Sequence, residues 1–326
     1  MHTIARRTLI ATALVTPQIA RAQTRRPLRI VIPFPPGGAV DSLGRVLADR
    51  LGPVLDQSVV VDNRSGGGGL IGADAVAKAA PDGTTIGVIG AATLCAAPVL
   101  QPTMPFDVAR DFRFVTQITD SAVLLGINAA TATQRGWNTL ADLLAWARQN
   151  PQKFSVAHAG ATTVSHLVLS ALATQGRVEF NMIPYRGGAQ AALDVVSGTI
   201  EGSADLPTAL VPLAEAGRVR ILGTSSGGRL GLVPSVPAFS ETPGLEGFDV
   251  RSWNMILLPA ATPEAEAQRL FAAIRQVGLT PGFRDALRPL GYDAVLSDSL
   301  DAAAQLVRAE TPRWRRLVEA SGARIE

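Results

Sequence analysis

The sequence predicts an α/β fold made of two doubly wound domains, and three observations support this prediction. Short β-branched runs alternate with segments of helical period from residue 28 onward. The alternation pauses at a proline-rich connection, Pro98–Pro105, and then restarts. The chain has 326 residues, of which 47% are hydrophobic. That size is enough to bury roughly three quarters of the unfolded surface in one or two globular domains. Strands separated by helices favour parallel sheets covered on both faces.

The first half of the chain supplies the elements of the first domain. Its strands are predicted from β-branched runs at Leu28–Ile32, Val59–Val61 and Thr85–Ile89. A helix with the apolar stripe Leu43, Val46, Leu47 and Leu51 and a small-residue helix around Ala73–Ala80 separate these strands. No charge occurs between Asp82 and Asp107, but prolines and glycines argue against a membrane span there. That stretch is therefore predicted to be a buried strand followed by a loop.

The second domain is expected to follow the proline-rich connection. Its strands are predicted at Val123–Ile127, Ser155–Ala157, Met182–Ile183 and Val219–Gly223. The predicted core stripes of its helices are Leu140, Leu143, Leu144 and Ala147; then Val164, Leu167, Val168, Ala171 and Leu172; then Ala189, Ala192, Leu193 and Val196. A capping box of Thr139 and Asp142 begins the first of these helices, and Pro151 ends it.

The C-terminal part is expected to add one strand and two helices. The strand is predicted at Met255–Leu258. Thr262 is expected to cap the next helix, with Pro263 in its first turn and a core stripe of Ala267, Leu270, Phe271 and Ile274. A final helical region over Ser299–Ala320 is expected to bend or break near Pro312 and to end at Gly322.

The N-terminus has the three parts of a secretory signal. Arg6 and Arg7 are basic, Leu9–Val15 is apolar, and Ala20–Ala22 forms a small-residue cleavage site. Pro17 makes a buried helix the weaker interpretation. We therefore expect residues 1–22 to be a signal peptide cleaved near Ala22, and the mature protein to be soluble in the periplasm. The paired arginines also fit twin-arginine export, so the export route stays open.

Charge and cysteine content narrow the function classes. Removing the three arginines of the first 22 residues leaves 30 − 3 = 27 basic against 27 acidic residues. A neutral mature chain without a basic run gives no reason to expect nucleic acid or an anionic membrane as a partner. Cys95 is the only cysteine, and two mature histidines do not make a zinc site with it. We therefore expect no disulfide, no metal and no cofactor.

The first candidate binding loop is Pro33–Asp41, between the first strand and the first helix. Open α/β sheets bind ligands at the carboxyl ends of their strands. Gly37 and Gly38 would let the backbone approach a ligand, and the unpaired N–H groups of the following helix favour an anion such as a carboxylate. The alternative is that these residues only shape a tight turn, with Asp41 as a helix-start carboxylate.

The second candidate loop is Ala159–His166, in the equivalent position of the second domain. Thr163 is the expected N-cap of the helix that begins near Val164, and Ser165 and His166 lie in its first turn, away from the apolar stripe. Two such loops could close on one anion. The alternative is a threonine cap followed by a solvent-exposed histidine.

Two further motifs fit enzyme signatures poorly. Gly67, Gly69 and Gly72 satisfy the dinucleotide-binding spacing, but no acid lies at the position where the ribose would need one. Gly223–Gly227 matches the nucleophile elbow around Ser225, yet every histidine precedes that serine in the chain. An exported hydrolase is therefore the weaker alternative, and no catalytic residues are predicted.

Several motifs, taken together and in order, resemble the Bug solute-binding proteins, the receptors of tripartite tricarboxylate transporters. These motifs are PFPPGGAVD (33–41), VVVDNRSGGGGLIGADAVA (59–77), APDGT (80–84), AGATTVSHL (159–167), PYRGG (184–188), SW (252–253) and ASGA (320–323). They cover nearly the whole mature chain.

The resemblance implies a two-lobed, type II periplasmic-binding-protein fold with a ligand cleft between two doubly wound sheets. It implies that residues 23–121 and 251–326 form one lobe and residues 122–250 an inserted second lobe. The ligand-binding residues that it implies are Phe34, Gly37, Gly38, Ala39 and Asp41 of the first lobe, and Ala161, Thr162, Thr163, Ser165 and Asp205 of the second. Ala161 and Thr162 replace the family's usual Asn-Gly pair, and the segment around Asp205 is one residue short.

The resemblance implies a monomer that binds a small carboxylate by lobe closure and delivers it to the permease subunits of a membrane transporter. A receptor that reports its ligand to a sensor system is the alternative from the same fold. The sequence leaves the identity of the ligand open.

Overall fold

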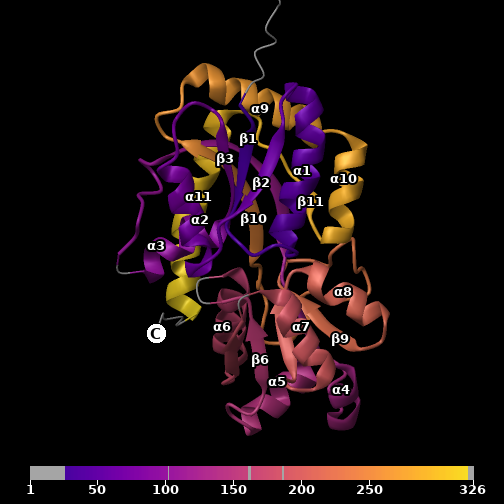
Figure 1. The fold of residues 1–326 in the computed structure, drawn as a ribbon. Coiled ribbons are helices and arrows are strands. Elements are labelled where there is room, and N and C mark those ends of the chain that lie inside the picture. The colour runs from indigo at the N-terminus through magenta and orange to yellow at the C-terminus, as the bar shows by residue number, and fades with distance from the viewer. Residues whose placement is uncertain (1–25, 102, 161–162, 186, 322–326) are drawn as a thin grey trace, which may run out of the picture.

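The computed structural model describes residues 26–101, 103–160, 163–185 and 187–321. It shows two lobes, one above the other in Figure 1, each built on its own β-sheet. The sheet of lobe 1 has the order β11 (Asp293–Ala294), β4 (Phe112–Ala122), β10 (Arg251–Pro259), β3 (Thr85–Gly90), β1 (Leu28–Ile32), β2 (Val59–Asn63). The sheet of lobe 2 has the order β7 (Asn181–Pro184), β6 (Ser155–His158), β8 (Gly202–Asp205), β5 (Leu124–Asn128), β9 (Val219–Thr224).

Helices cover both sheets. Lobe 1 carries α1 (Ala39–Leu55), η1 (Gly67–Gly69), α2 (Leu70–Ala77), the π-helical turn η2 (Ala92–Ala96), α3 (Ala97–Leu100), α9 (Glu264–Gly278), α10 (Pro281–Leu287), η4 (Arg288–Leu290) and α11 (Leu300–Ser321). Lobe 2 carries α4 (Ala129–Arg135), α5 (Leu140–Gln149), α6 (Val164–Gly176), α7 (Gly188–Ser197), α8 (Pro207–Glu215) and η3 (Phe239–Glu241). None of the helices among the described residues is long and apolar enough to cross a membrane.

Both sheets are mixed, which corrects the expectation of parallel sheets. The strands of the βαβ units are parallel, with β1 beside β2 and β3, and β6 beside β7 and β8. In contrast, β10 is antiparallel to β3 and β4, and β5 is antiparallel to β8 and β9. The physical reason is that the chain crosses between the lobes twice. A strand that leaves a sheet and one that returns to it from the other lobe run in opposite directions.

The long strand β4 was not predicted, because its sequence lacks an apolar alternation. Thr116 and Thr119 are both fully buried in it. Their hydroxyl groups are satisfied by distant partners: Asn254 Nδ2 donates to Thr119 Oγ1 at 2.9 Å, and Ser297 N donates to Thr116 Oγ1 at 2.9 Å. Polar residues can therefore occupy the interior of this strand without leaving unpaired groups.

Several helices differ from their predicted forms. The core stripe of α7 is Ala191, Ala192 and Val195, whereas the predicted Leu193 is 65% exposed. The N-cap of α9 is Pro263 rather than Thr262. The stretch after β3 is helical rather than a loop.

Two further helices, α5 and α11, test the predicted capping box and the predicted break at Pro312. The capping box of Thr139 and Asp142 begins α5 as predicted. The final helix, α11, continues through Pro312 without a break. Buried Val307, Trp314 and Val318 anchor it on both sides of the proline. Its predicted end at Gly322 lies outside the described residues.

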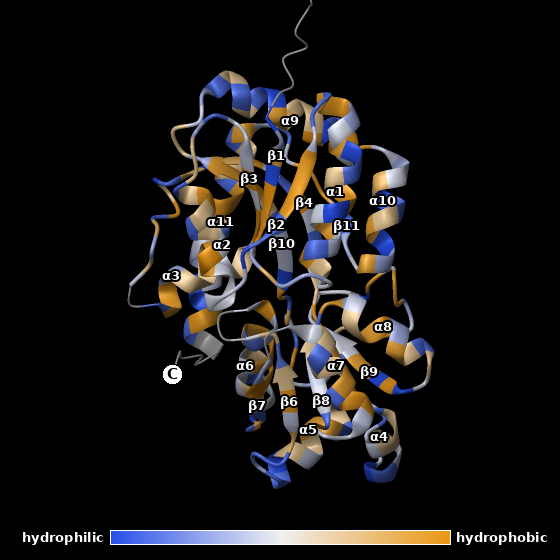
Figure 2. Ribbon diagram, in the orientation of Figure 1, coloured by the Kyte–Doolittle hydropathy of each residue, from blue (hydrophilic) through white to orange (hydrophobic). Residues whose placement is uncertain are grey.

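Each lobe has its own apolar core, and in lobe 1 orange strands mark it in Figure 2. The two cores approach each other through α11, which runs from lobe 1 toward α6 of lobe 2 (Figure 1). Leu167 of α6 shares a buried cluster with Trp253 and Trp314, and Leu317 of α11 packs against the core of lobe 2. The C-terminal helix therefore contacts both lobes beside the cleft.

Candidate functional site

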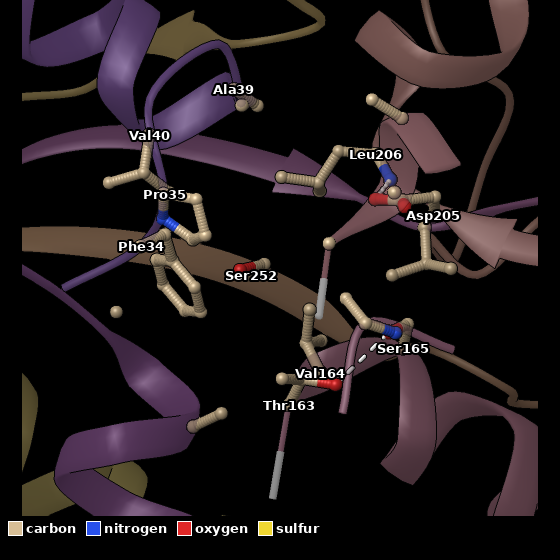
Figure 3. A pocket seen from close by; sticks show the side chains of 18 of the residues that line it. Phe34, Pro35, Ala39, Val40, Thr163, Val164, Ser165, Asp205, Leu206 and Ser252 are labelled. Atoms are coloured by element: carbon tan, nitrogen blue, oxygen red, sulfur yellow. Dashed lines mark hydrogen bonds between the residues drawn. The ribbon is translucent and has the colours of Figure 1, made fainter. Parts of the chain in front are cut away.

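A cavity of about 350 Å³ lies between the lobes and takes residues from both of them (Figure 3). Lobe 1 contributes Phe34, Pro35, Pro36, Gly37, Gly38, Ala39, Val40, Gly68, Gly90, Ala92, Thr93, Ser252, Asn254 and Tyr292. Lobe 2 and the crossover into it contribute Val123, Ala159, Thr163, Val164, Ser165, Gly187, Gly188, Ala189, Gln190, Asp205 and Leu206. Seven of the ten predicted ligand-binding residues are in this set: Phe34, Gly37, Gly38, Ala39, Thr163, Ser165 and Asp205.

The first predicted loop connects β1 to α1 at the wall of the cavity. Gly37 has a φ of +85°, a conformation that side chains other than glycine rarely adopt. Gly38 is the N-cap of α1 in an extended conformation, and a Cβ atom placed on it would meet nothing closer than the Pro35 carbonyl oxygen at 3.8 Å. The first N–H groups of a helix have no partners within it. The N-terminus of α1 therefore faces the cavity with its backbone accessible.

Asp41 does not line the cavity; it lies beneath the loop and is only 2% exposed. Its carboxylate accepts hydrogen bonds from Gly37 N, Arg45 Nε and Asn63 Nδ2, each at 2.9 Å. Asn63 also donates to the Phe34 carbonyl oxygen at 3.1 Å. Burial by itself would raise the pKa of Asp41, but these hydrogen bonds outweigh burial and lower that pKa. The network therefore holds the loop in shape with a charged, buried acid.

The second predicted loop connects β6 to α6 and is held by neutral groups. Ala159 N donates to Ser165 Oγ at 3.0 Å, and Thr163 Oγ1 donates to the Gly160 carbonyl oxygen at 2.7 Å. The two hydroxyl oxygens lie 3.1 Å apart, so the Ser165 proton is placed toward Thr163. With that assignment both hydroxyl groups hold the loop, and a ligand would meet mainly backbone N–H groups. The other two predicted residues, Ala161 and Thr162, lie outside the described residues.

His166 fits neither of its two predicted roles, because it stacks on His158 instead. The two rings lie 4.7 Å apart at an interplanar angle of 23°. The Nδ1 atoms of both are buried, and neither has a hydrogen-bond partner in the part of the chain that the structure describes. Burial lowers the pKa of His158, and burial together with the neighbouring His158 lowers the pKa of His166 to about 4. The pair is therefore neutral near pH 7, and it joins the end of β6 to the first turn of α6, on either side of the second loop.

Asp205 ends strand β8 at the opposite side of the cavity from Phe34 (Figure 3). Its Oδ1 accepts a hydrogen bond from Leu206 N at 2.7 Å, whereas Oδ2 is buried and has no partner among the described residues. Burial raises the pKa of this carboxyl group to about 6, against the effect of the Leu206 hydrogen bond.

Several cavity residues were not predicted as ligand-binding residues. Gly187–Gln190, at the start of α7, follow strand β7 and begin with two glycines, a signal as strong as that of the first loop. Ser252, Asn254 and Tyr292 come from the C-terminal part and reach the cavity through strand β10 and the turn before β11. No local pattern points to them, because the fold alone brings them to the cleft.

Among the described lining residues, the positive potential of the cavity comes from helix ends rather than from basic side chains, and Asp205 is the acidic residue. The N-termini of α1, α6 and α7 all supply residues to its lining. Among the described lining residues there is no lysine, arginine or histidine. Helix N-termini carry partial positive charge and free N–H donors. This arrangement suits a small anionic group, with apolar contacts from Phe34, Val40, Val164 and Leu206 along the rest of the ligand.

Ser225 of the elbow-like motif has a structural role. It is fully buried, accepts from Val123 N at 3.0 Å and donates to the Val250 carbonyl oxygen at 2.6 Å. Val123 lies between β4 and β5, and Val250 directly precedes β10, so the two belong to the segments that cross between the lobes. The hydroxyl proton is therefore engaged, and the motif joins the crossovers instead of presenting a nucleophile.

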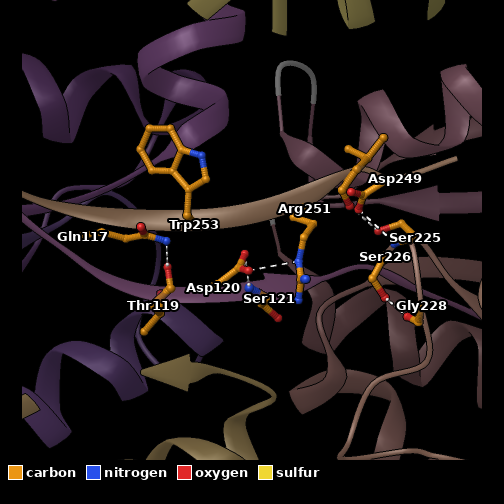
Figure 4. A network of polar contacts seen from close by, with 12 residues as sticks. Gln117, Thr119, Asp120, Ser121, Ser225, Ser226, Gly228, Asp249, Arg251 and Trp253 are labelled. Carbon is orange, nitrogen blue, oxygen red and sulfur yellow. Dashed lines mark hydrogen bonds and ion pairs between the residues drawn. The ribbon is translucent and has the colours of Figure 1, made fainter. Parts of the chain in front are cut away.

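A second contact joins the crossovers on the lobe 1 side. Arg251 Nε lies 3.0 Å from Asp120 Oδ2, linking the start of β10 to the end of β4 (Figure 4). Burial raises the pKa of Asp120 despite the nearby Arg251.

Comparison with known proteins gives a consistent result. A family model described as the tripartite tricarboxylate transporter family receptor matches residues 43–323. A UPF0065 protein from the tcbD-tcbE intergenic region of Pseudomonas sp. strain P51 is 37% identical over 96% of this chain and 93% of its own length. Protein BugT of Bordetella pertussis is 30% identical over 97% of this chain and 96% of its own length.

Two solved structures are similar throughout. Rpa4515 of R. palustris, with adipate, is 29% identical with a TM-score of 0.86, covering 93% of this chain and 100% of that chain. MatC of Rhodopseudomonas palustris, with bound malate, is 30% identical with a TM-score of 0.82, covering 90% of this chain and 99% of that chain.

Proposed function

The chain belongs to the receptor family of tripartite tricarboxylate transporters, and on that premise we propose that it is a periplasmic solute-binding protein. It captures a small carboxylate between its two lobes and delivers the ligand to the permease subunits of a membrane transporter. The related structures that hold adipate and malate support the ligand class. The family and the predicted signal peptide, residues 1–22 with cleavage near Ala22, support the compartment. The working form is expected to be a monomer.

The observation that carries this proposal is the convergence of helix N-termini from both lobes on one cavity. The α1 end, with Gly37, Gly38 and Ala39, lies in lobe 1, and the α6 end, with Thr163 and Ser165, lies in lobe 2. One carboxylate has two oxygen atoms, each able to accept more than one hydrogen bond. It can therefore satisfy donors from both lobes at once, so the bound anion holds the lobes together.

Binding is proposed to begin on one open lobe and to finish by lobe closure. The hinges are the two crossovers near residues 121 and 251, where Ser225 and the ion pair of Asp120 with Arg251 join the segments. The rigid bodies are predicted to be residues 23–121 with 251–326, and residues 122–250. Closure excludes water, and the lower dielectric strengthens each contact of an N–H group with the anion.

The protein is proposed to leave its ligand chemically unchanged. The support for this is the receptor family and the engagement of Ser225 in structural hydrogen bonds. The permease then receives the same molecule that the receptor captured.

Isothermal titration calorimetry of the purified protein against small mono-, di- and tricarboxylates tests this function. At least one carboxylate is expected to bind with micromolar or tighter affinity, while alkylamines and neutral alcohols of the same length are not. Mass spectrometry after long incubation is expected to recover the ligand intact. Absence of binding to every carboxylate, or conversion of the bound one, would contradict the proposal.

A further inference from the structure

We propose that Asp205 and Tyr292 form a second subsite for a hydrogen-bond donor, so that the cavity prefers a monocarboxylate with an amide, ammonium or hydroxyl group at its far end. This inference rests on the proposed carboxylate-binding function. It goes beyond that function, because it predicts that this protein binds unbranched dicarboxylates more weakly than a monocarboxylate with a hydrogen-bond donor at its far end.

Asp205 presents an acceptor that no described residue satisfies. Its Oδ1 is bonded to Leu206 N, while its Oδ2 is buried and has no partner among the described residues. Both residues line the cavity. An ionised carboxylate can only accept hydrogen bonds. A ligand that supplies an N–H or O–H group here would therefore satisfy the one unpaired oxygen, which otherwise stays unpaired at a cost.

The absence of a side chain at Gly188 sets the position of this carboxylate. A Cβ atom at Gly188 would lie 1.7 Å from Asp205 Oδ2, so the carboxylate packs directly against the first turn of α7. Any side chain at this position would displace Asp205. The carboxylate is therefore held in one place at the edge of the cavity.

Tyr292 presents the second unsatisfied group, and it comes from the other lobe. The residue is 3% exposed, it lines the same cavity, and its hydroxyl group has no hydrogen-bond partner among the described residues. Asn254 lies close enough to that hydroxyl group to lower its pKa, and its Nδ2 also donates to Thr119 Oγ1 at 2.9 Å. Burial, and to a lesser degree the nearby charge of Asp205, raise the pKa of Tyr292, so it stays a neutral phenol.

The two groups line one cavity and come from segments that are in contact across the lobes. The turn before β11 meets the start of α8 so closely that a Cβ atom at Gly291 would lie 2.3 Å from Pro207 Cβ. Tyr292 follows Gly291, and Asp205 precedes Leu206 and Pro207. A donor group bound here would be shared by one residue of each lobe, as the carboxylate is at the helix ends.

A second carboxylate at this end would meet the charge of Asp205. Two carboxylates in one site cannot both ionise at low cost, so one of them must take up a proton. The pKa of Asp205, raised by burial to about 6, means that the residue is mostly ionised at pH 7.5 and mostly protonated at pH 5. Exclusion of dicarboxylates is therefore expected at pH 7.5 and weaker at pH 5.

Calorimetry with probes matched in length tests the inference. The six-carbon set is adipate, its monoamide, 6-aminohexanoate and hexanoate, and the four-carbon set is succinate, its monoamide, 4-aminobutanoate and butanoate. At pH 7.5 the best monoamide or amino acid is expected to bind at least tenfold more tightly than both the dicarboxylate and the plain monocarboxylate of the same length.

The Asp205→Asn variant tests the assigned residue. Its preference for the monoamide over the dicarboxylate is expected to fall at least tenfold, because the amide NH₂ of asparagine can donate to a carboxylate. Glu215→Gln, an equal charge change on the exposed surface of α8 in the same lobe, is expected to bind all probes as the unaltered protein does. In the unaltered protein the preference is also expected to shrink at pH 5.

The outcomes separate this inference from the proposed function. Dicarboxylates that bind as tightly as the monoamides at pH 7.5, or monocarboxylates that bind equally well without a donor, would overturn the donor subsite and leave carboxylate binding intact. A preference that Asp205→Asn leaves unchanged would also overturn it. Failure of all eight probes to bind would overturn the proposed function and the inference together.

Discussion

The loop before α1 and the loop before α6 occupy equivalent places in the two lobes but are held in shape by different chemistry. In lobe 1 the brace is a buried, charged carboxylate, Asp41, with donors on three sides. In lobe 2 the brace consists of the hydroxyl groups of Thr163 and Ser165 beside a neutral histidine pair. Both leave the first N–H groups of a helix facing one cavity. A charged carboxylate network in lobe 1 and neutral hydroxyl groups beside a histidine pair in lobe 2 therefore both present helix N–H groups to the cavity.

The largest effect is expected where the backbone itself must meet the ligand. Gly38→Val should lower carboxylate affinity at least ~100-fold, about 3 kcal/mol, because the branched side chain blocks approach to the α1 end. The extended conformation at Gly38 tolerates a Cβ atom, so unfolding by urea should change by no more than about 1 kcal/mol. Gly231→Val, at an exposed glycine with open space around it, is the control. Affinity retained in Gly38→Val would show that lobe 1 does not bind the anion.

Because His166 in lobe 2 has a lowered pKa, the free energy of unfolding is expected to fall in acid. The pKa of His166 is about 4 in the folded protein and about 6.5 in an unfolded chain. Between these values the unfolded chain binds a proton that the folded chain does not, so stability falls as the pH falls from 6.5 to 4. The loss is about 2–3 kcal/mol for this residue.

Urea unfolding of the unaltered protein and of His166→Gln at pH 7.5 and pH 4.5 measures this contribution. Asp205 acts in the opposite direction, because its raised pKa lets the folded state take up a proton near pH 6. That contribution is common to both proteins and cancels in the comparison. Equal losses of stability in the two proteins would contradict a buried, neutral His166.

The Asp41 hydrogen-bond network of lobe 1 is expected to contribute less to the free energy of unfolding than the protonation of His166 removes in acid. It is expected to contribute more than a single hydroxyl group. Asp41→Ala leaves Gly37 N and Asn63 Nδ2 without their acceptor, which should cost about 2 kcal/mol in urea unfolding. Asp285→Ala removes an exposed acid of α10, and its effect should stay within about 0.5 kcal/mol. If both variants were equally stable, the Asp41 network would have no bracing role.

The smallest effect on stability and affinity is expected from removing the Ser165 hydroxyl group, which holds the loop before α6. Ser165→Ala removes the acceptor of Ala159 N and should cost about 1 kcal/mol in unfolding, with a several-fold loss of carboxylate affinity. Ser170→Ala, one turn later on α6 and away from the cavity, should leave affinity unchanged. A loss of affinity as large as that of Gly38→Val would mean that the Ser165 hydroxyl binds the ligand directly.

The two loops also show what a sequence can predict. A strand, a glycine pair and a helix start are local signals, so the Pro33–Asp41 and Ala159–His166 loops could both be found. The alternative interpretation of Asp41 as a helix-start carboxylate anticipated its bond to Gly37 N, but its bond to Asn63, 22 residues away, could not be predicted. The stacking of His166 on His158 depended on the same kind of tertiary contact.

The other features that the sequence did not predict share one physical cause. Strand β4 lacks an apolar alternation, and its buried Thr116 and Thr119 are accommodated because the segment before α11 and β10 supply hydrogen-bond partners. Tyr292, Asn254 and Ser252 reach the cavity because the chain returns to lobe 1 after building lobe 2. The mixed strand directions follow from the same return. Local periodicity carries no information about such crossings.

The most direct test of the account is an amide NMR titration of the purified protein with the tightest-binding carboxylate found by calorimetry. The N–H signals of Gly38 and Ala39 in lobe 1, and those of Val164 and Ser165 in lobe 2, should all shift and saturate at the same ligand concentration. Shifts confined to one of the two loops, or to neither, would contradict the claim that both helix ends hold a single anion.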